Sequence, residues 1–404
     1  MSTTKVQTLQ KYDPKTTAYP ILIAISASHF INDLLQSILP SIYPLIKDQY
    51  HLSYSQIGLI TFTFQIASSL LQPFVGIYTD KRPMPYSFVV GMLCTLAGII
   101  SLSYAGSFAA ILASAAMIGV GSSIFHPEAS KLSFYASGGK RGMAQSIFQI
   151  GGNTGTAVGP LLIALIIVTH GQSYLILFSL FSMLGILILW QVGNWYNGFL
   201  KENVTATRNK VIEQHNLPRS KVIVSVAILL VLIFSKYFYT AGMTNYFTFY
   251  LIDKFHISVK ESQFYLFIFL ASVAAGTFFG GPVGDRIGRK YVIWFSILGV
   301  APFTLILPYM GLTATIFMAM IIGLILSSAF SAILVYAQEL LPGKIGMVSG
   351  LFFGFAFGMG ALGSAVLGNL AEKTSIQYVF HICSFLPLIG IFTLFLPNLK
   401  KKSS

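Results

Sequence analysis

The sequence predicts an all-α membrane protein of twelve transmembrane helices in two six-helix repeats. Three observations predict this fold: the composition, the spacing of the apolar runs and an internal repeat. Hydrophobic residues make up 55% of the 404 residues and charged residues 9%, whereas a soluble domain averages about 25% charged residues. Most of the protein surface therefore cannot face water, and no separate soluble domain fits between the apolar runs.

The apolar runs are long enough to cross a membrane, since a spanning helix uses about 20 apolar residues. In order, the predicted spans are 19–46, 55–79, 86–105, 108–131, 142–169, 173–195, 221–251, 262–283, 291–310, 312–338, 345–371 and 376–397. They divide the chain into a tail (1–18), an N-terminal bundle (19–195), a linker (196–220), a C-terminal bundle (221–397) and a second tail (398–404).

Basic residues are distributed unevenly between the two sides of the membrane. Of the 25 Lys and Arg residues, Lys236 falls inside a span, and four lie in loops on one side: Lys47, Lys254, Lys260 and Lys373. The other 20 lie in the tails, the linker and the loops of the opposite side. The positive-inside rule therefore predicts that both termini are cytoplasmic.

The repeat appears when the second half is aligned with the first. Gly76 and Asp80 match Gly281 and Asp285 at a spacing of 205 residues, and Gly142-Met143 matches Gly346-Met347 at 204. Duplicated halves are typical of membrane transporters.

Composition and motifs also exclude several functions. The net charge is +13, but the basic residues stand between apolar runs, so no nucleic-acid partner is expected. Cys94 and Cys383 lie inside apolar runs, and no His or Cys spacing is typical of a metal site. Because paired catalytic carboxylates and a phosphate-binding loop are also missing, we expect no enzyme, no cofactor and no metal.

The first span carries four polar side chains on one helical face: His29, Asn32, Asp33 and Gln36. An ionisable group at membrane depth usually faces a bundle interior or a wet cavity. We therefore interpret Asp33 as a proton-coupling residue tuned by His29, and Asn32 and Gln36 as substrate-binding residues. The alternative is a buried Asp33 held by hydrogen bonds to neighbouring helices.

The fourth span contains His126-Pro127-Glu128, where Pro127 can open the helix locally. His126 and Glu128 are candidates for a second proton relay. The alternative is an interfacial salt bridge between Glu128 and Lys131.

Further polar residues point to a substrate cavity. Gln149 and Asn153 form a stripe on the fifth span, and Lys236 lies about a dozen residues into the seventh, near Tyr239 and Thr240. We interpret Lys236, Gln149, Asn153 and Tyr239 as substrate-binding, with Lys236 attracting an anion. The alternative for Lys236 is snorkelling to an interface.

Two loops repeat one motif after the second and eighth spans: "GIYTDKRP" (76–83) and "GPVGDRIGRK" (281–290). Each provides a glycine and a carboxylate that can cap a helix N-terminus and pair with Arg or Lys. We expect a gate formed by Gly76, Asp80, Arg82, Gly281, Asp285, Arg286 and Arg289. Both loops resemble the loop signature of the major facilitator superfamily, although the first has Pro83 and Pro85 where the family favours Gly-Arg.

The fifth span reads "GGNTGTAVGPLLIA" (151–164), with glycines at four-residue spacing that let helices approach closely. The segment with Gly155, Gly159 and Pro160 also resembles the proton-antiporter signature of this superfamily, except that Ile163 and Ala164 replace its last glycines. We assign these three residues to gating, with simple packing as the alternative.

A more specific resemblance covers the first half. The stretch "HFINDLLQSILPSIYPLIKDQYHLSYSQIGLI" (29–60) and "FHPEASK" (125–131) closely resemble the fosmidomycin resistance protein family. This resemblance implies an inner-membrane efflux pump that exchanges protons for fosmidomycin, a small phosphonate-hydroxamate antibiotic.

We therefore predict a monomeric, proton-driven antiporter that works by alternating access in the bacterial inner membrane. Its partners are a small anionic substrate, protons and lipids, and the proton gradient is the driving force. The same residues also permit a symporter that imports a small organic anion.

Overall fold

The computed structural model describes residues 16–42, 45–46, 49–52, 54–167, 170–209, 217–257 and 259–399. In this part of the chain all regular secondary structure is helical. The N-terminal half contains α1 (Tyr19–Ser41), α3 (Tyr54–Ser69), α4 (Gln72–Lys81), α5 (Ser87–Ser103), α6 (Phe108–Tyr135), α7 (Arg141–Leu162), a π-helical turn (Ile163–Ile167), a 3₁₀ segment (Gln172–Phe178) and α9 (Ser179–Asn209).

The C-terminal half repeats this order of long helices. It contains α10 (Arg219–Phe255), α11 (Val259–Ile287), α12 (Arg289–Ile297), α13 (Ala301–Ile306), a 3₁₀ turn (Leu307–Tyr309), α14 (Leu312–Ser327), α15 (Ala329–Leu340), α16 (Ile345–Lys373), α17 (Ile376–Ser384) and a 3₁₀ segment (Leu386–Phe395).

Helical segments occupy each of the twelve predicted spans. Among the described residues, ten helical stretches are long and apolar enough to cross a membrane, and α5 is a shorter apolar helix. The more polar α7 occupies the place of the fifth span. The ends differ most at the first span, where α1 stops at Ser41 rather than 46, and at the sixth, where α9 continues to Asn209 rather than ending at 195. A helix need not end where the lipid does, so apolar content alone does not locate its last turn.

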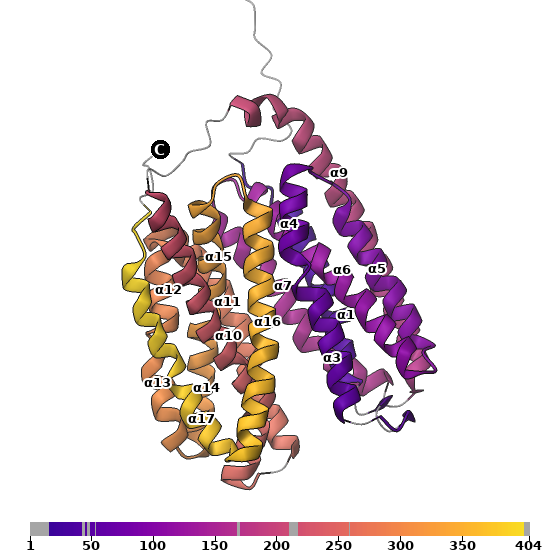
Figure 1. Cartoon of the computed structure of the whole chain (residues 1–404), viewed down its shortest axis with the longest axis vertical. Helices are drawn as coiled ribbons and strands as arrows, with labels where there is room; N and C mark the ends of the chain where they lie inside the picture. Colours follow the sequence, from indigo (N-terminus) through magenta and orange to yellow (C-terminus); the bar gives the residue numbers. More distant parts are fainter. Residues whose placement is uncertain are drawn as a thin grey trace, which may run out of the picture.

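The N-terminal half and the C-terminal half lie side by side (Figure 1). They meet where α7 packs against α11 and where α4 packs against α16. These two pairs are equivalent in the repeat, because α4 and α11 end on the two Gly-Asp motifs. The division into two bundles and a linker remains a prediction, and residues 210–216 of that linker lie outside the described ranges.

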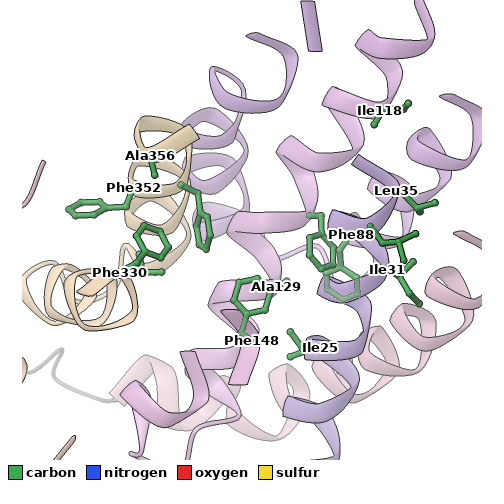
Figure 2. Packing of buried hydrophobic residues seen from close by; sticks show 14 of the residues in the cluster. Ile25, Ile31, Leu35, Phe88, Ile118, Ala129, Phe148, Phe330, Phe352 and Ala356 are labelled. Carbon is green, nitrogen blue, oxygen red and sulfur yellow. The ribbon is translucent and has the colours of Figure 1, made fainter. Parts of the chain in front are cut away.

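The main buried apolar cluster spans the junction between the halves (Figure 2). It joins Ile31 of α1 and Phe148 of α7 to Phe330 of α15 and Phe352 of α16, all at most 3% exposed. Large apolar side chains elsewhere remain exposed, such as Leu187 at 64%. This is the distribution expected for helices that face lipid on one side and protein on the other.

One end of the bundle collects the basic loops. The first described residues lie there, because the Thr17 hydroxyl donates to the Ser137 carbonyl between α6 and α7. The last described residues lie there too, because the Lys290 ammonium donates to the Leu396 carbonyl at 2.6 Å. We call this the basic end.

Candidate functional site

The polar face predicted on α1 converges on one carboxylate. Asp33 Oδ1 accepts hydrogen bonds from the Asn32 amide at 3.0 Å and the Gln36 amide at 3.3 Å. His29 Nε2 lies 3.2 Å from Oδ2 and His126 Nε2 lies 3.3 Å from Oδ1. We call these five residues the Asp33 cluster. They lie inside α1 and α6, nearer to the C-terminal end of each helix than to its N-terminal end.

The orientation of His29 is fixed by α7. Its Nδ1 lies 2.7 Å from the Phe148 carbonyl oxygen, and its ring stacks on the Phe148 ring with centroids 4.0 Å apart. A carbonyl can only accept, so Nδ1 carries a hydrogen. A Cβ at Gly152 would overlap His29 and Asp33, so α7 can approach the cluster only because this residue is glycine.

The orientation of His126 follows the same rule. Its Nδ1 lies 3.0 Å from the Ser122 carbonyl oxygen, which makes Nδ1 the donor. The Ser122 hydroxyl in turn donates to Gln36 at 2.9 Å. His126 Nε2 reaches Asp33 at ion-pair distance without satisfying the geometry of a hydrogen bond, so we treat that contact as electrostatic.

These hydrogen bonds limit the ways in which the Asp33 cluster can hold protons. A neutral imidazole with its hydrogen on Nδ1 presents a bare Nε2. Two such nitrogens facing a bare carboxylate would place three acceptors together. One proton, held by Asp33 or by a histidine, removes that repulsion. The two histidine nitrogens and the Asp33 carboxylate oxygen lie within 4.8 Å of one another, a spacing that would also admit a metal ion.

A second polar site lies on α10. Lys236 borders a cavity of about 90 Å³ whose polar wall includes Gln149, Asn153, Thr240 and Thr277. We call this cavity the Lys236 pocket. Its apolar wall is formed by Phe269, Val273, Leu326 and Phe330.

Few neighbouring groups stabilise the positive charge of the Lys236 ammonium. The side chain is 7% exposed, and its nearest hydrogen-bond acceptor is the Ser327 carbonyl at 3.5 Å. The rings of Tyr237 and Phe330 lie 5.3 and 5.4 Å away, within cation–π range. Within the described ranges no carboxylate lies within 4 Å of this ammonium. Asp33 instead pairs with His29, and Glu128 pairs with Lys131.

The structure separates the predicted substrate-binding residues into two groups. Gln149 and Asn153 line the Lys236 pocket, whereas Asn32 and Gln36 contact Asp33. Tyr239, also predicted, is buried instead in the apolar cluster that includes Phe247 and Phe380. Tyr237 also lines the Lys236 pocket but was not predicted from sequence. Its position next to Lys236 could have indicated this role.

Glu128 lies apart from the Asp33 cluster, contrary to the predicted relay with His126. It is fully buried and pairs with Lys131 at 2.6 Å. Thr79 also donates to Glu128, and Lys131 donates to Thr79 at 3.1 Å. The alternative read from sequence, a pair with Lys131, is therefore the one observed, although the pair is buried.

The two Asp residues of the repeated motifs cap helices of the opposite half. Asp80 accepts from the backbone N–H groups of Gly346 and Met347, at 2.9 and 2.8 Å. Asp285 accepts from those of Gly142 and Met143, at 3.0 and 2.9 Å. We call these contacts the Asp80 latch and the Asp285 latch. Each satisfies unpaired donors at a helix N-terminus with a negative charge.

Close backbone contact accompanies each latch. A Cβ at Gly76 would overlap the Gly346 carbonyl, and one at Gly281 would overlap the Gly142 carbonyl. Arg289 lies 3.1 Å from both Asp285 and Glu339. The other two predicted gating cations, Arg82 and Arg286, are exposed.

The glycine stripe of α7 packs against α1. A Cβ at Gly155 would overlap the Phe30 carbonyl, and one at Gly159 would overlap the Ser37 hydroxyl. This is the packing role considered from sequence. Pro160 lies in α7, but its side chain is outside the described set.

The two helical halves meet at one end and enclose an ammonium halfway along α10 and an Asp–His cluster. Ionisable groups inside apolar helices of a duplicated helical bundle are typical of membrane transport proteins. Sequence comparison identifies the family. Residues 25–352 and 229–404 match the Major Facilitator Superfamily, and the chain belongs to it. It is a transporter and not an enzyme. The family and fold predicted from sequence are thus confirmed.

Two curated relatives span nearly the whole chain. The chain is 58% identical over 386 residues to the fosmidomycin resistance protein of Escherichia coli (strain K12), covering 96% of this chain and 95% of the relative. It is 43% identical over 398 residues to the uncharacterized MFS-type transporter YfnC of Bacillus subtilis (strain 168), covering 98% and 97%.

Solved structures share the fold at low sequence identity. The fold resembles the transporter FucP in its outward conformation, with a TM-score of 0.72 and 14% identity over 94% of this chain and 99% of that one. It also resembles the human organic anion transporter MFSD10, with a TM-score of 0.73 and 16% identity over 94% and 100%.

Proposed function

We propose that this protein is a proton-coupled antiporter that exports small anionic compounds of the fosmidomycin type and thereby confers drug resistance. It works as a monomer in the bacterial inner membrane, with both termini in the cytoplasm. The distribution of basic residues supports this orientation, and it makes the basic end cytoplasmic. The 58% identity to a fosmidomycin resistance protein supports the cargo class.

One observation carries the proposal: the buried ammonium of Lys236 has no carboxylate partner among the described residues and borders a pocket halfway along α10. An isolated charge in a low-dielectric interior costs several kcal/mol. A phosphonate entering the pocket would offset that cost through charge-assisted hydrogen bonds with Lys236. The Asp33 cluster can hold the proton that moves in the opposite direction.

The pocket is too small for cargo in this conformation. Its volume is about 90 Å³, whereas ligand pockets usually measure about 300–1,000 Å³. Both latches are formed at the basic end. Cargo would therefore enter from the cytoplasm only after the latches open and the halves move apart, as alternating access requires.

The test is transport of fosmidomycin by the purified protein in liposomes under an imposed proton gradient. We expect the compound to move against the direction of the protons. Asp33→Asn should abolish this uphill movement but retain exchange without a gradient, because the amide keeps the shape and loses the titrating group. Lys236→Ala should severely impair fosmidomycin binding, and Lys236→Arg should impair it partly.

Each result can contradict a separate part of the proposal. Movement of fosmidomycin with the protons would identify an importing symporter instead. Uphill transport by Asp33→Asn would remove Asp33 from the coupling role. Unchanged fosmidomycin affinity in Lys236→Ala would remove the anion site from the Lys236 pocket.

A further inference from the structure

The polar groups of the Lys236 pocket differ in whether their hydrogens are already used. Three hydroxyl groups and one amide of its wall donate to acceptors within the protein. They belong to Thr240, Thr277, Ser327 and Asn153. A ligand in the pocket would therefore have to bind to the remaining donors.

Ser331 is one of these remaining donors. It lines the pocket, is fully buried, and its hydroxyl has no hydrogen-bond partner. A serine inside a helix often donates to the carbonyl four residues earlier, which here is that of Ser327. That carbonyl is instead the nearest acceptor of the Lys236 ammonium, at 3.5 Å. An unpartnered hydroxyl and an ammonium without a counterion thus border the same cavity.

The helix that carries Ser331 begins at this pocket. The tenth span is divided, because α14 ends at Ser327 and α15 begins at Ala329. The division lies near the middle of the apolar stretch Leu312–Leu340. Ser331 is therefore in the first turn of α15, where the helix dipole favours a negative charge. Helices interrupted at mid-depth form ion and substrate sites in membrane transporters.

The opposite half completes the pocket with amides. Helices α7 and α16 are equivalent in the repeat, at a spacing of 204 residues. On α16, Phe353 and Phe357 cover His126 with apolar rings. On α7, the equivalent positions are Gln149 and Asn153, which line the Lys236 pocket. The NH₂ group of Gln149 can donate to an anion there. Such an anion would contact both halves and so favour the conformation in which they are together.

The size and charge of the pocket limit which anion fits. Its volume is about 90 Å³, and one water-sized sphere needs about 10–15 Å³. A chloride ion is only slightly larger than a water molecule, so it fits with space for water beside it. One negative charge also matches the single ammonium, whereas a dianion would bring a second charge into the low-dielectric interior without a partner.

We propose that the Lys236 pocket binds a chloride-sized inorganic monoanion, held by Lys236 and Ser331, while the basic end is closed. The ion compensates the buried ammonium in the conformation that is too small for cargo. Cargo displaces it when the halves separate and the pocket enlarges. This site does not depend on the direction of cargo transport, so its test is independent of the antiport test.

The experiment measures the thermal unfolding midpoint of the full-length protein in detergent against chloride concentration. Gluconate, a monoanion too large for the pocket, replaces chloride so that ionic strength stays constant. The wild-type midpoint should rise with chloride, as expected when a ligand binds the folded state. Ser331→Ala should need about tenfold more chloride for the same rise, because a hydrogen bond to a charged group is lost.

Lys236→Met keeps the side-chain length but removes the charge. Its midpoint in gluconate should equal or exceed that of the wild type, because no buried ammonium is left unpaired, and chloride should not raise it. Ser272→Ala is the matched control, a buried serine of α11 whose hydroxyl already donates to the Ile268 carbonyl. It should respond to chloride like the wild type.

Several results would overturn the site. Equal wild-type midpoints in chloride and gluconate would exclude the ion, and a chloride response retained by Lys236→Met would place it elsewhere. A normal chloride response in Ser331→Ala would remove Ser331 from the site. Phosphate at the same ionic strength should stabilise less than chloride, and the reverse order would overturn the assignment to a chloride-sized monoanion.

Discussion

The Asp80 latch and the Asp285 latch make the same backbone contacts, yet different ion pairs support them. Near Asp80, the ammonium of Lys131 lies 4.0 Å away and is committed to Glu128, in a pair at most 1% exposed within the N-terminal half. Near Asp285, Arg289 also binds Glu339, and Glu339 reaches Arg141 of the other half at 3.2 Å. The first network stabilises one half, whereas the second also joins the two halves.

This difference predicts separate roles for the ion pairs near Asp80 and those near Asp285. The buried Glu128–Lys131 pair keeps its partners when the halves separate, because both lie on α6. The Arg141–Glu339 pair must break, because it joins α7 to α15. Changes to the Glu128–Lys131 pair should therefore affect folding, and changes to the Arg141–Glu339 pair should affect the conformational equilibrium.

The largest effect is expected for Lys131→Met. This change leaves Glu128 as a buried charge without its cation, which typically costs about 3–5 kcal/mol. Thermal unfolding of the purified protein should show a strongly lowered midpoint. The double variant Glu128→Gln/Lys131→Met should recover most of the loss. An unchanged midpoint in the single variant would mean that the pair does not stabilise this half.

Smaller effects are expected for Asp80→Asn and Asp285→Asn. An amide can still accept one hydrogen bond but lacks the charge, so each change should weaken basic-end closure by about 1–2 kcal/mol, or roughly five- to thirtyfold in population. Labelling of Thr240→Cys from the basic side, with Cys94 and Cys383 replaced by Ser, reports the opening.

Lys81→Gln is the matched control, because it removes an exposed charge beside Asp80 without touching the latch. Labelling should increase in both Asp variants and stay at the reference level in the control. If only one Asp variant responds, the two latches contribute unequally to closure despite their matching backbone contacts.

The smallest effect concerns the cross-half pair. Arg141 is 38% exposed at its side chain, so solvent screens the interaction and a coupling of about 0.2–1 kcal/mol is expected. A double-mutant cycle with Arg141→Gln and Glu339→Gln, read by the same labelling assay, gives this value. A coupling larger than the effect of Asp285→Asn would make this pair, rather than the cap, the main closing contact.

The fold and the residues with a chemical role could be predicted from the sequence. The contacts that these residues make with other helices could not. The repeat aligned Asp80 with Asp285 and Gly142-Met143 with Gly346-Met347, which are the groups that form the latches. It could not show that each Asp caps the helix of the opposite half, because that depends on how the halves dock. Helical spacing likewise grouped His29 with Asp33 on α1.

Contacts with residues on other helices could not be predicted either, because they also depend on how the helices pack. The contact between His126 and Asp33 requires α6 to pack beside α1 at one particular depth. Glu128, only two residues further along α6, faces Lys131 and Thr79 instead. A one-dimensional pattern gives the face of a helix but not the neighbour that this face meets.

The glycine contacts at the basic end determine how the halves can part. Gly76 meets the Gly346 carbonyl, and Gly281 meets the Gly142 carbonyl, so bare backbone touches bare backbone at both places. The side chains beside these contacts, Ser146 and the two capping Asp residues, are short and can follow only a small displacement. These backbone contacts between the halves are thus either fully formed or absent, and intermediate separations are disfavoured. The protein closes its basic end as a switch with two positions, and leakage through a half-open state is disfavoured by the shape of the main chain itself.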